Sequence, residues 1–416
     1  MCAITRHQRG FILMSCLLAL QRLAFRRTVF AVACLLIFGF ISNAALGYVL
    51  ASHADPPRVE TPPVAVIVGN NAPESSRLRI AVFTPTTADN TYWPEIHAVL
   101  HAVAADLEID LEIHEFSVLD RFATVSAGVR RLTTEPLPDA AIFSVEFGQA
   151  SRLMRAAEKM GIPFFLNGPL FPEELAEIGK RPGRDYTYWA GYFHEDEERK
   201  GYLLAQELIA AAREGNAGKA DTIQVAGING SRSWYGSILR EAGLRRAVEE
   251  HPDVRLMQMV YTRWTPEEGR RMASQILRRY PEISVLWAAS DQLAIGAAEA
   301  IDNDPADDGP VVLTGGLDLS DAGIDAVLKG QLVATVAGTS LLWAQVMIDL
   351  HDHLHGLDPV SDSSPVLLSA PIVADRSTAE DIRAWIRSFD SIDFRRYSRF
   401  HHSKDVSRLS EITGDR

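Results

Sequence analysis

The chain has 416 residues, 47% of them hydrophobic, and carries a formal net charge of −13 at pH 7. This hydrophobic content is typical of a globular protein and excludes a mostly disordered chain, and at about 100–200 residues per domain the length suggests two or three domains. The acidic balance argues against a nucleic-acid-binding protein, which would show a basic surface.

The N-terminal segment has the layout of a secretory signal peptide. Arginines precede an apolar run at 28–42, and small residues lie at the −3 and −1 positions of possible cuts after Ala44 and Ala54. The apolar segment is also long enough to cross a bilayer, so a retained membrane anchor is the alternative. We therefore expect residues 1–54 to be a signal peptide or membrane anchor and residues 55–77 to be a Pro-rich linker.

From Leu78 onward, the chain alternates strand-like and helix-like segments. The strand candidates are short apolar runs, which are typical of strands buried on both faces in a parallel sheet covered by helices. In chain order, the predicted strands are 79–84, 111–116, 140–145, 163–168, 187–192, 223–228, 256–262, 284–290, 311–317 and 333–338.

One helix start carries a clear capping signal. In "TPEEGRRMASQILRRY", Thr265 has the character of an N-cap, Pro266 occupies the first helical position, and Glu268 completes a capping box. About ten strands are more than one open sheet usually holds. We therefore predict an α/β protein with two doubly wound, Rossmann-like lobes.

Polar and aromatic residues gather in the loops that follow the predicted strands. In open parallel sheets, ligands bind beyond the carboxyl ends of the strands. "TADNTYW" is such a loop, and its large aromatics are unexpected there because they normally enter a core. We interpret Tyr92 and Trp93 as the wall of a ligand cleft. Other candidates in such loops are Asn90, Asn167, Trp234, Trp264, Asp291 and Asp318.

"SVLWAASDQLAIGAAEAI", "VVLTGGLDLSDAGIDAVLKGQLVATVAG" and "ADNTYW" together resemble the type 1 periplasmic binding proteins of sugar ABC transporters, the ribose-binding class. The resemblance covers about residues 78–390. It implies a periplasmic protein whose two lobes, joined by a three-stranded hinge, close over a sugar-like or polyol ligand. The implied parts are an N-terminal lobe of 78–193 plus 339–372, a C-terminal lobe of 194–338 plus 373–400, and a tail of 401–416.

"DNTYW", "FFLNGPL" and "FRRYS" are also similar to the LuxP-like receptors for autoinducer-2. That family presents its loaded form to a membrane sensor kinase, whereas the ribose-binding class delivers a solute to a permease. The sequence leaves both inner-membrane partners open, an ABC permease or a sensor kinase. A LacI-type regulator would need a helix-turn-helix where this chain has an apolar segment and a Pro-rich linker.

The resemblance assigns five residues to the ligand site. Trp93 and Trp264 match stacking aromatics, and Arg240 matches a helix arginine used in both families. Asn167 matches a ligand contact of the LuxP-like receptors. Asp318 matches the sugar-binding aspartate of a Gly-Phe-Asp motif that reads Gly-Leu-Asp here.

Three further positions combine a match with departures. Asp291 matches the aspartate that follows the polar residue of the family motif, where Ser290 replaces the usual asparagine. Gly338 stands where the ribose class has a glutamine and the LuxP-like receptors have a second arginine. A borate diester requires paired guanidinium donors. With a single arginine, we expect a neutral polyol rather than the borated signal.

Structural alternatives exist for each assignment. For the aromatic residues the alternative is core packing, and for Arg240 it is a surface ion pair. Asp318 has the alternative of capping the helix that starts near Ser320. We interpret the acidic run "HEDEER" as the start of a helix whose dipole favours negative charge.

No motif requires catalysis or a cofactor. Cys2, Cys16 and Cys34 all precede the main body, which excludes a disulfide or thiolate site there. His351 and His355 share a helix face, but no third metal ligand is evident. Walker, G-x-G-x-x-G, G-x-S-x-G and H-E-x-x-H motifs are absent. We therefore expect a binding protein that is not an enzyme, with no metal and no cofactor.

Overall fold

The computed structural model describes residues 77–86, 92–117, 121–146, 148–179, 185–215, 222–304, 311–357, 366–402 and 409. The expected signal peptide or anchor, nearly all of the expected linker, Asn90 and most of the expected tail lie outside these residues. Within the described ranges, no helix has both the length and the apolar character needed to cross a membrane.

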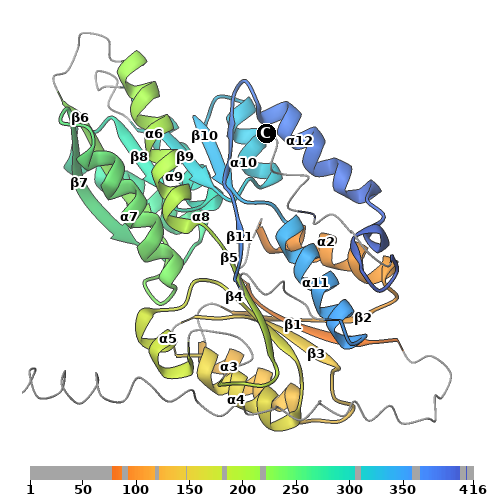
Figure 1. Cartoon of the computed structure of the whole chain (residues 1–416). Coiled ribbons are helices and arrows are strands. Elements are labelled where there is room, and N and C mark those ends of the chain that lie inside the picture. Colours follow the sequence, from red (N-terminus) through yellow and green to blue (C-terminus); the bar gives the residue numbers. More distant parts are fainter. Residues whose placement is uncertain are drawn as a thin grey trace, which may run out of the picture. The chain divides into compact units, whose positions relative to one another are not determined.

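Two six-stranded sheets organise the chain (Figure 1). The first has the order β11-β5-β4-β3-β1-β2 and is parallel throughout. The second has the order β12-β10-β9-β8-β6-β7, with only β12 antiparallel. The first comprises β1 (Arg79–Thr86), β2 (Asp110–Ser117), β3 (Ala140–Ser144), β4 (Phe164–Asn167), β5 (Trp189–Glu195) and β11 (Val366–Ser369). The second comprises β6 (Ile223–Asn229), β7 (Val254–Tyr261), β8 (Val285–Ala288), β9 (Leu313–Leu317), β10 (Ala334–Ala337) and β12 (Ile372–Asp375).

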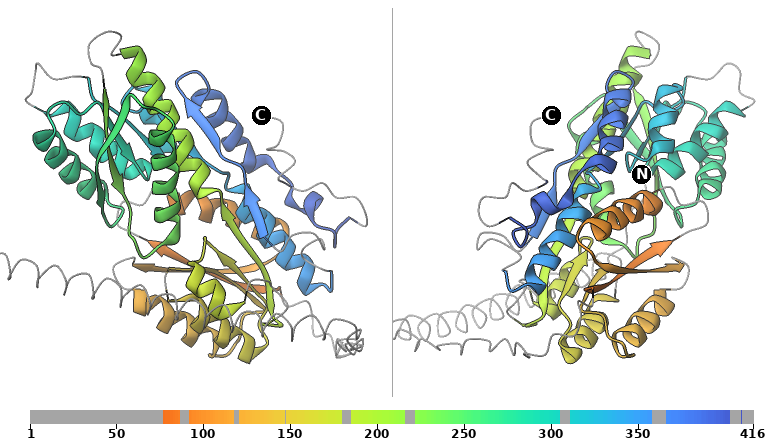
Figure 2. Two further views of the ribbon diagram at one scale, coloured as in Figure 1. Left: turned by 60° about the vertical axis from the view of Figure 1, so that its left-hand side comes forward. Right: turned by 90° about the vertical axis from the view of Figure 1, so that its right-hand side faces the viewer.

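Helices cover both faces of each sheet, as Figure 2 shows. The predicted cap of one of them is confirmed, because the Thr265 side chain accepts a hydrogen bond from the Glu268 amide. The helices are α2 (Tyr92–Asp106), α3 (Arg121–Leu132), α4 (Ala150–Met160), α5 (Pro172–Ile178), α6 (Glu197–Gly215), α7 (Tyr235–Glu249), α8 (Pro266–Arg279), α9 (Asp291–Asp302), α10 (Asp321–Leu328), α11 (Leu341–Leu354) and α12 (Ala379–Arg387), followed by the 3₁₀ turns η1 (Ser388–Ser391) and η2 (Phe394–Tyr397).

Alternating side chains of β1 show why both faces of the first sheet are buried. Ile80 and Val82 pack in the cluster that includes α2 and α11, whereas Ala81 and Phe83 pack in the cluster on the opposite face with α4. Successive residues of a strand point to opposite faces, so a continuous apolar run serves two cores. This confirms the predicted α/β class with helix-covered parallel sheets.

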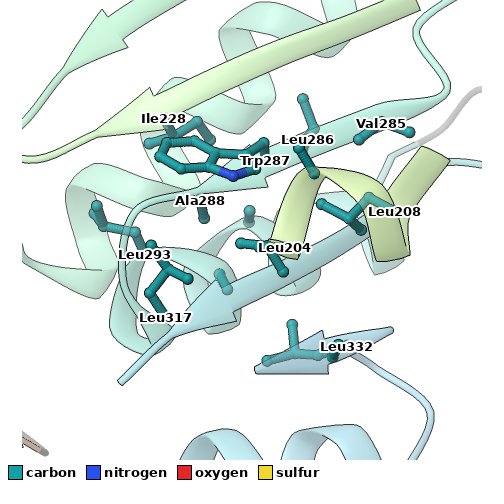
Figure 3. Close-up of a cluster of buried hydrophobic side chains, with 14 of the residues drawn as sticks. Leu204, Leu208, Ile228, Val285, Leu286, Trp287, Ala288, Leu293, Leu317 and Leu332 are labelled. Atoms are coloured by element: carbon teal, nitrogen blue, oxygen red, sulfur yellow. The ribbon is translucent and has the colours of Figure 1, made fainter. Parts of the chain in front are cut away.

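The second sheet has one large core. Leu204 and Leu208 of α6 lie against β8 and β9, and Figure 3 shows Leu204 on the side of Leu317 and Leu208 on the side of Val285 and Leu286. The Trp287 indole N–H donates to the Gly201 carbonyl at 3.2 Å, so this buried ring leaves no polar atom unpaired. The core therefore fixes α6, which carries charged residues at its N-terminus, against the sheet.

Among the described residues, the connections from β5 to α6, from β10 to α11 and from β11 to β12 pass between the sheets. They come together at Gly338, whose amide donates to Glu195 Oε2 at 3.1 Å. A Cβ at Gly338 would lie 2.6 Å from Ser369 Oγ and 3.0 Å from the Glu195 carboxyl carbon. No larger residue fits at position 338, because Ser369 and Glu195 occupy the space that its side chain would need.

After α12 the chain returns to the first sheet. Phe389 of η1, Phe394 of η2 and Leu409 are buried in the same cluster as α2 and α11. Ala379 and Ile382 of α12 belong instead to the core of the second sheet. The C-terminal part of the chain thus packs on both cores.

Candidate functional site

A cavity of about 140 Å³ lies at the carboxyl ends of strands from both sheets. A single water molecule requires about 10–15 Å³ of such volume, so the cavity is much larger than a buried water site and can receive a small molecule. The predicted site residues that line it are Tyr92, Trp93, Asn167, Trp234, Arg240, Trp264, Ser290 and Asp318.

The wall contributed by the first sheet is an aromatic cluster. Trp93 meets Tyr92 edge-on with ring centres 5.1 Å apart, and it meets Trp343 edge-on at 5.6 Å. Trp343 comes from α11 and is 2% exposed, so most of this ring belongs to the core. The wall is thus partly an extension of the hydrophobic core, and ligand-wall and core-packing interpretations both apply to it.

The wall contributed by the second sheet carries the other two tryptophans. Trp234 and Trp264 meet edge-on with ring centres 5.9 Å apart. Trp264 has a left-handed backbone with φ of 69°. Its ring lies directly on Gly230, where a Cβ would come within 1.9 Å of the indole. A glycine is therefore required for Trp264 to reach the cavity.

Arg240 is the basic residue of this wall, and it is 5% exposed. Its Nε donates to Glu197 Oε2 at 2.6 Å, and Nη1 donates to the Ala289 carbonyl at 2.5 Å. Asp318 lies 3.8 Å away, and the guanidinium sits 4.9 Å from the centre of the Trp234 ring. The ion pair of Arg240 is thus buried beside the cavity and does not lie on the surface.

The acidic run "HEDEER" contains the start of α6, as expected, with Glu197 and Glu198 in its first turn, but part of it also faces the cavity. Glu195 and Glu197 line the cavity and hold the buried Lys200 between them, with Lys200 Nζ 2.9 Å from Glu197 Oε2. Burial raises the pKa of Glu197, but the charges of Arg240 and Lys200 outweigh it and hold the pKa below its ordinary value. The positive charges of Arg240 and Lys200 are therefore balanced by the carboxylates of Glu195 and Glu197.

Asp318 is the carboxylate that this network leaves least satisfied. Among the described residues, no donor hydrogen-bonds to its side chain, and Arg240 is its one ion-pair partner. Burial raises the pKa of Asp318 well above its ordinary value, although the Arg240 charge acts in the opposite direction. Asp318 does not cap α10, because Ser320 accepts the capping hydrogen bond from Gly323.

Asp291 is the described candidate that does not line the cavity. It is fully buried, and its carboxylate accepts hydrogen bonds from Ser320 and Thr335. The adjacent Ser290 does line the cavity, but its hydroxyl accepts a hydrogen bond from the Leu293 amide at 3.3 Å as the cap of α9.

Polar residues complete the first wall. Ser144 Oγ donates to Asn167 Oδ1 at 3.1 Å, which fixes the amide at the end of β4. Glu146, just after β3, accepts a hydrogen bond from Ser233 Oγ at 2.9 Å, and Ser233 follows β6 of the other sheet. This contact joins the two walls at the cavity.

Sequence reasoning missed several lining residues for identifiable reasons. The predicted strand 187–192 stops short of Glu195, where β5 ends, and the sequence indicates no strand-end site there. Trp343 lies inside a helix and carries no strand-end signal. Missed residues include Phe116, Glu146, Gln149, His194, Glu195, Glu197 and Trp343. Within the described part of the chain, no three His, Cys, Asp or Glu side chains are arranged to hold a metal ion.

Known proteins share this architecture. A family model described as a periplasmic binding protein domain matches residues 80–356. A periplasmic sugar-binding protein from Pseudomonas fluorescens is 27% identical with a TM-score of 0.68, and the match covers 80% of this chain and 97% of that one. An ABC transporter solute-binding protein from Actinobacillus succinogenes, solved with D-allose, is 22% identical with a TM-score of 0.62, covering 73% and 100%.

One curated relative matches over a shorter stretch. A D-apiose import binding protein from Paraburkholderia graminis is 25% identical over 114 residues, which are 27% of this chain and 36% of the relative. The match thus spans about a third of the length of that relative.

Proposed function

This chain belongs to the family of periplasmic binding protein domains, and we propose that it captures a monosaccharide or polyol between two lobes and delivers it to an ABC permease. As a member of a binding-protein family it is not an enzyme, as predicted. The observation that carries the proposal is the cavity at the strand ends of the two sheets, with aromatic walls and polar groups between them. The sugar-binding, D-allose-bound and D-apiose-importing relatives support it.

The chemistry of the cavity suits a sugar. A sugar ring has apolar C–H faces, which flat aromatic side chains accept, and a rim of hydroxyls that requires fixed donors and acceptors. Trp93 and Trp264 supply aromatic faces from opposite walls, and Asn167, Arg240 and Asp318 supply polar groups. Asn90, which we also expect at this rim, lies outside the described residues.

The charges of the cavity favour a neutral ligand over the borate diester of the LuxP-like receptors. Arg240 is already paired with Glu197, and Gly338 leaves no space for a second basic side chain. Glu146 and Asp318 contribute carboxyl groups, and no further basic side chain, to the cavity beside Arg240. A sensory role, in which the loaded protein contacts a membrane kinase, is the alternative for the partner. Neighbouring genes for a permease and ATPase, or for a sensor kinase, distinguish the two.

We also propose a division into lobes that follows the two cores. The expected bounds, 78–193 with 339–372 and 194–338 with 373–400, change slightly, because β5 runs to Glu195 and β12 begins at Ile372. The first lobe comprises 78–195 with 339–371 and adds the segment 388–400, because Phe389 and Phe394 pack on its core. The second lobe comprises 196–338 with 372–387. The lobes meet through the hydrogen bond from Ser233 to Glu146, through Phe171 and Tyr235, whose ring centres are 4.9 Å apart, and through a 2.8 Å hydrogen bond from the Asp321 amide to Glu95.

A solute screen tests the function. Thermal shift with D-allose, D-apiose, D-ribose, myo-inositol and autoinducer-2 with and without borate is followed by calorimetry on each hit. We expect a neutral sugar or polyol to bind, and small-angle scattering to show a smaller radius of gyration for the loaded protein because a ligand favours the state it binds better. A hit that requires borate, or binding without a change in radius, contradicts this proposal.

Export is tested separately. We propose that the mature protein is periplasmic and lacks residues 1–44 or 1–54, unless the apolar segment is retained as an anchor. N-terminal sequencing of protein from the periplasmic and membrane fractions distinguishes these outcomes. An intact N-terminus in the cytosolic fraction contradicts export.

A further inference from the structure

The turn that carries Asp318 has an unusual backbone. Asp318 and Leu319 have φ values of 142° and 54°, a region that side chains other than glycine rarely adopt. Such strain persists only where surrounding contacts determine the conformation. Side chains outside the turn must therefore stabilise this backbone conformation.

Two buried side chains hold this turn. The Leu319 amide donates to Thr335 Oγ1 at 3.1 Å, and the Ser320 amide donates to Asp291 Oδ2 at 2.9 Å. Thr335 Oγ1 in turn donates its proton to Asp291 Oδ1 at 2.6 Å, and Ser320 Oγ donates to Asp291 Oδ2 at 2.8 Å. Two consecutive amides of the strained turn are thus bound by one connected pair, Asp291 and Thr335.

Two glycines, Gly316 and Gly323, provide the space that the Asp291 carboxylate occupies. A Cβ at Gly323 would lie 2.0 Å from Asp291 Oδ2, and one at Gly316 would lie 2.4 Å from Oδ1. The Asp291 carboxylate therefore lies between two glycines and faces Ser320 and Thr335 instead of the cavity. Its neighbour in space, Asp318, is the carboxylate that faces the cavity.

We propose that Asp291 and Thr335 are positioning residues of the binding site, which act by holding the strained turn so that the Asp318 carboxylate points at the ligand. This inference rests on the proposed function, because it assigns them a role in binding through a residue of that cavity. If they merely stabilised the fold, their loss would lower stability without affecting affinity through Asp318.

Matched threonine substitutions separate the two roles. Thr335→Val removes the hydroxyl at nearly constant volume, and Thr335→Ser restores it. Thr314→Val is the control, because Thr314 is equally buried, lies on the adjacent strand β9, and donates to the Leu286 carbonyl at 2.7 Å without contacting the turn. We expect Thr335→Val to weaken binding about five- to tenfold, with Thr335→Ser and Thr314→Val within about twofold of the original affinity.

The affinity is measured by calorimetry for whichever of D-allose, D-apiose, D-ribose and myo-inositol binds most tightly. A double-mutant cycle supplies the decisive readout, because residues that act through one another are not additive. In an Asp318→Ala background, Thr335→Val is expected to change affinity by less than about twofold. An equal loss in both backgrounds, or no loss in either, overturns the positioning role.

Hydrogen exchange tests the inference without any ligand. The amides of Leu319 and Ser320 should exchange faster in Thr335→Val and in Asp291→Asn than in the original protein. Their exchange rates should be unchanged in Thr314→Val. Unchanged exchange in Thr335→Val and Asp291→Asn would overturn the proposal even if a sugar binds. If no sugar of the panel binds, or Asp318→Ala binds as tightly as the original, the proposed function of the cavity fails, whatever the exchange shows.

Discussion

The two walls of the cavity use tryptophan in different ways. In the first wall, Trp93 packs edge-on against Trp343 and so continues the hydrophobic core. In the second wall, Trp234 lies against the guanidinium of Arg240, which is paired with Glu197. A ligand that contacts the first wall would thus touch an extension of the hydrophobic core, whereas one that contacts the second wall would touch a buried charge network.

We expect the largest loss of stability when Arg240 is removed from the second wall. Arg240→Ala leaves Glu197 and Asp318 without their guanidinium partner, so we expect a loss of about 3–5 kcal/mol in the free energy of unfolding as well as loss of binding. Chemical denaturation measures the loss, and a variant as stable as the original contradicts the network. Arg240→Lys, which keeps the charge, serves as the control.

The first wall is tested by Trp93→Ala. Because Trp93 is half-buried against Tyr92 and Trp343, we expect about 2–3 kcal/mol less stability together with weaker sugar binding. Denaturation and calorimetry measure the two losses. Trp93→Phe should recover most of the stability. If Trp93→Ala changed affinity alone, the first wall would not be an extension of the core.

Asp318→Ala sharpens the contrast between affinity and stability. Binding of the best neutral sugar should weaken at least tenfold, since a hydrogen bond to a charged group contributes about 1.5–3 kcal/mol. Burial raises the pKa of Asp318, which means that burying its ionised carboxylate lowers the stability of the folded protein. We therefore expect the unliganded variant to unfold at the same or a higher temperature. A lower melting temperature would show that Asp318 supports the fold.

Glu95, which lies where the two lobes meet, should make the stability of the protein depend on pH. Burial raises its pKa to about 7, against an ordinary value of 4.5, although the Asp321 amide acts in the opposite direction. A group whose pKa is raised on folding contributes stability below its unfolded pKa and loses it as pH rises through its folded pKa. We expect a loss of about 1–2 kcal/mol between about pH 4.5 and 7, discounted for partial exposure to water. Glu95→Gln should remove this part of the pH dependence in thermal melts, and an identical profile contradicts the assignment.

Ser233→Ala should have the smallest effect. It removes the 2.9 Å hydrogen bond to Glu146 that joins the walls. A hydrogen bond of this kind contributes about 0.5–1.5 kcal/mol, so affinity should fall about two- to tenfold with stability unchanged. Calorimetry and thermal melts measure both quantities. Unchanged affinity would mean that this contact does not favour the liganded arrangement.

The fold and much of the lining followed from local sequence patterns. Apolar runs identified the core strands, and the strand-end rule pointed to Trp264 and Asp318, because such loops converge in any doubly wound sheet. Tyr92 and Trp93, predicted on a loop, lie instead in the first turn of α2, and they still line the cavity. The rule missed Glu195, because its strand continues beyond the apolar run. It also failed for Asp291, which follows β8 but whose carboxylate lies between Gly316 and Gly323 and does not line the cavity, a packing that the sequence does not reveal.

Gly338 has a consequence for how long a captured sugar stays bound. The three crossing segments meet there without room for a methyl group, so sliding of one lobe past the other would force Ser369 and Glu195 into the backbone. If the proposed lobes rotate about this point, the contact at Gly338 is kept and the rim where Ser233 and Tyr235 meet the opposite lobe opens. We therefore expect mutations at the rim to change the dissociation rate of the sugar more than its association rate.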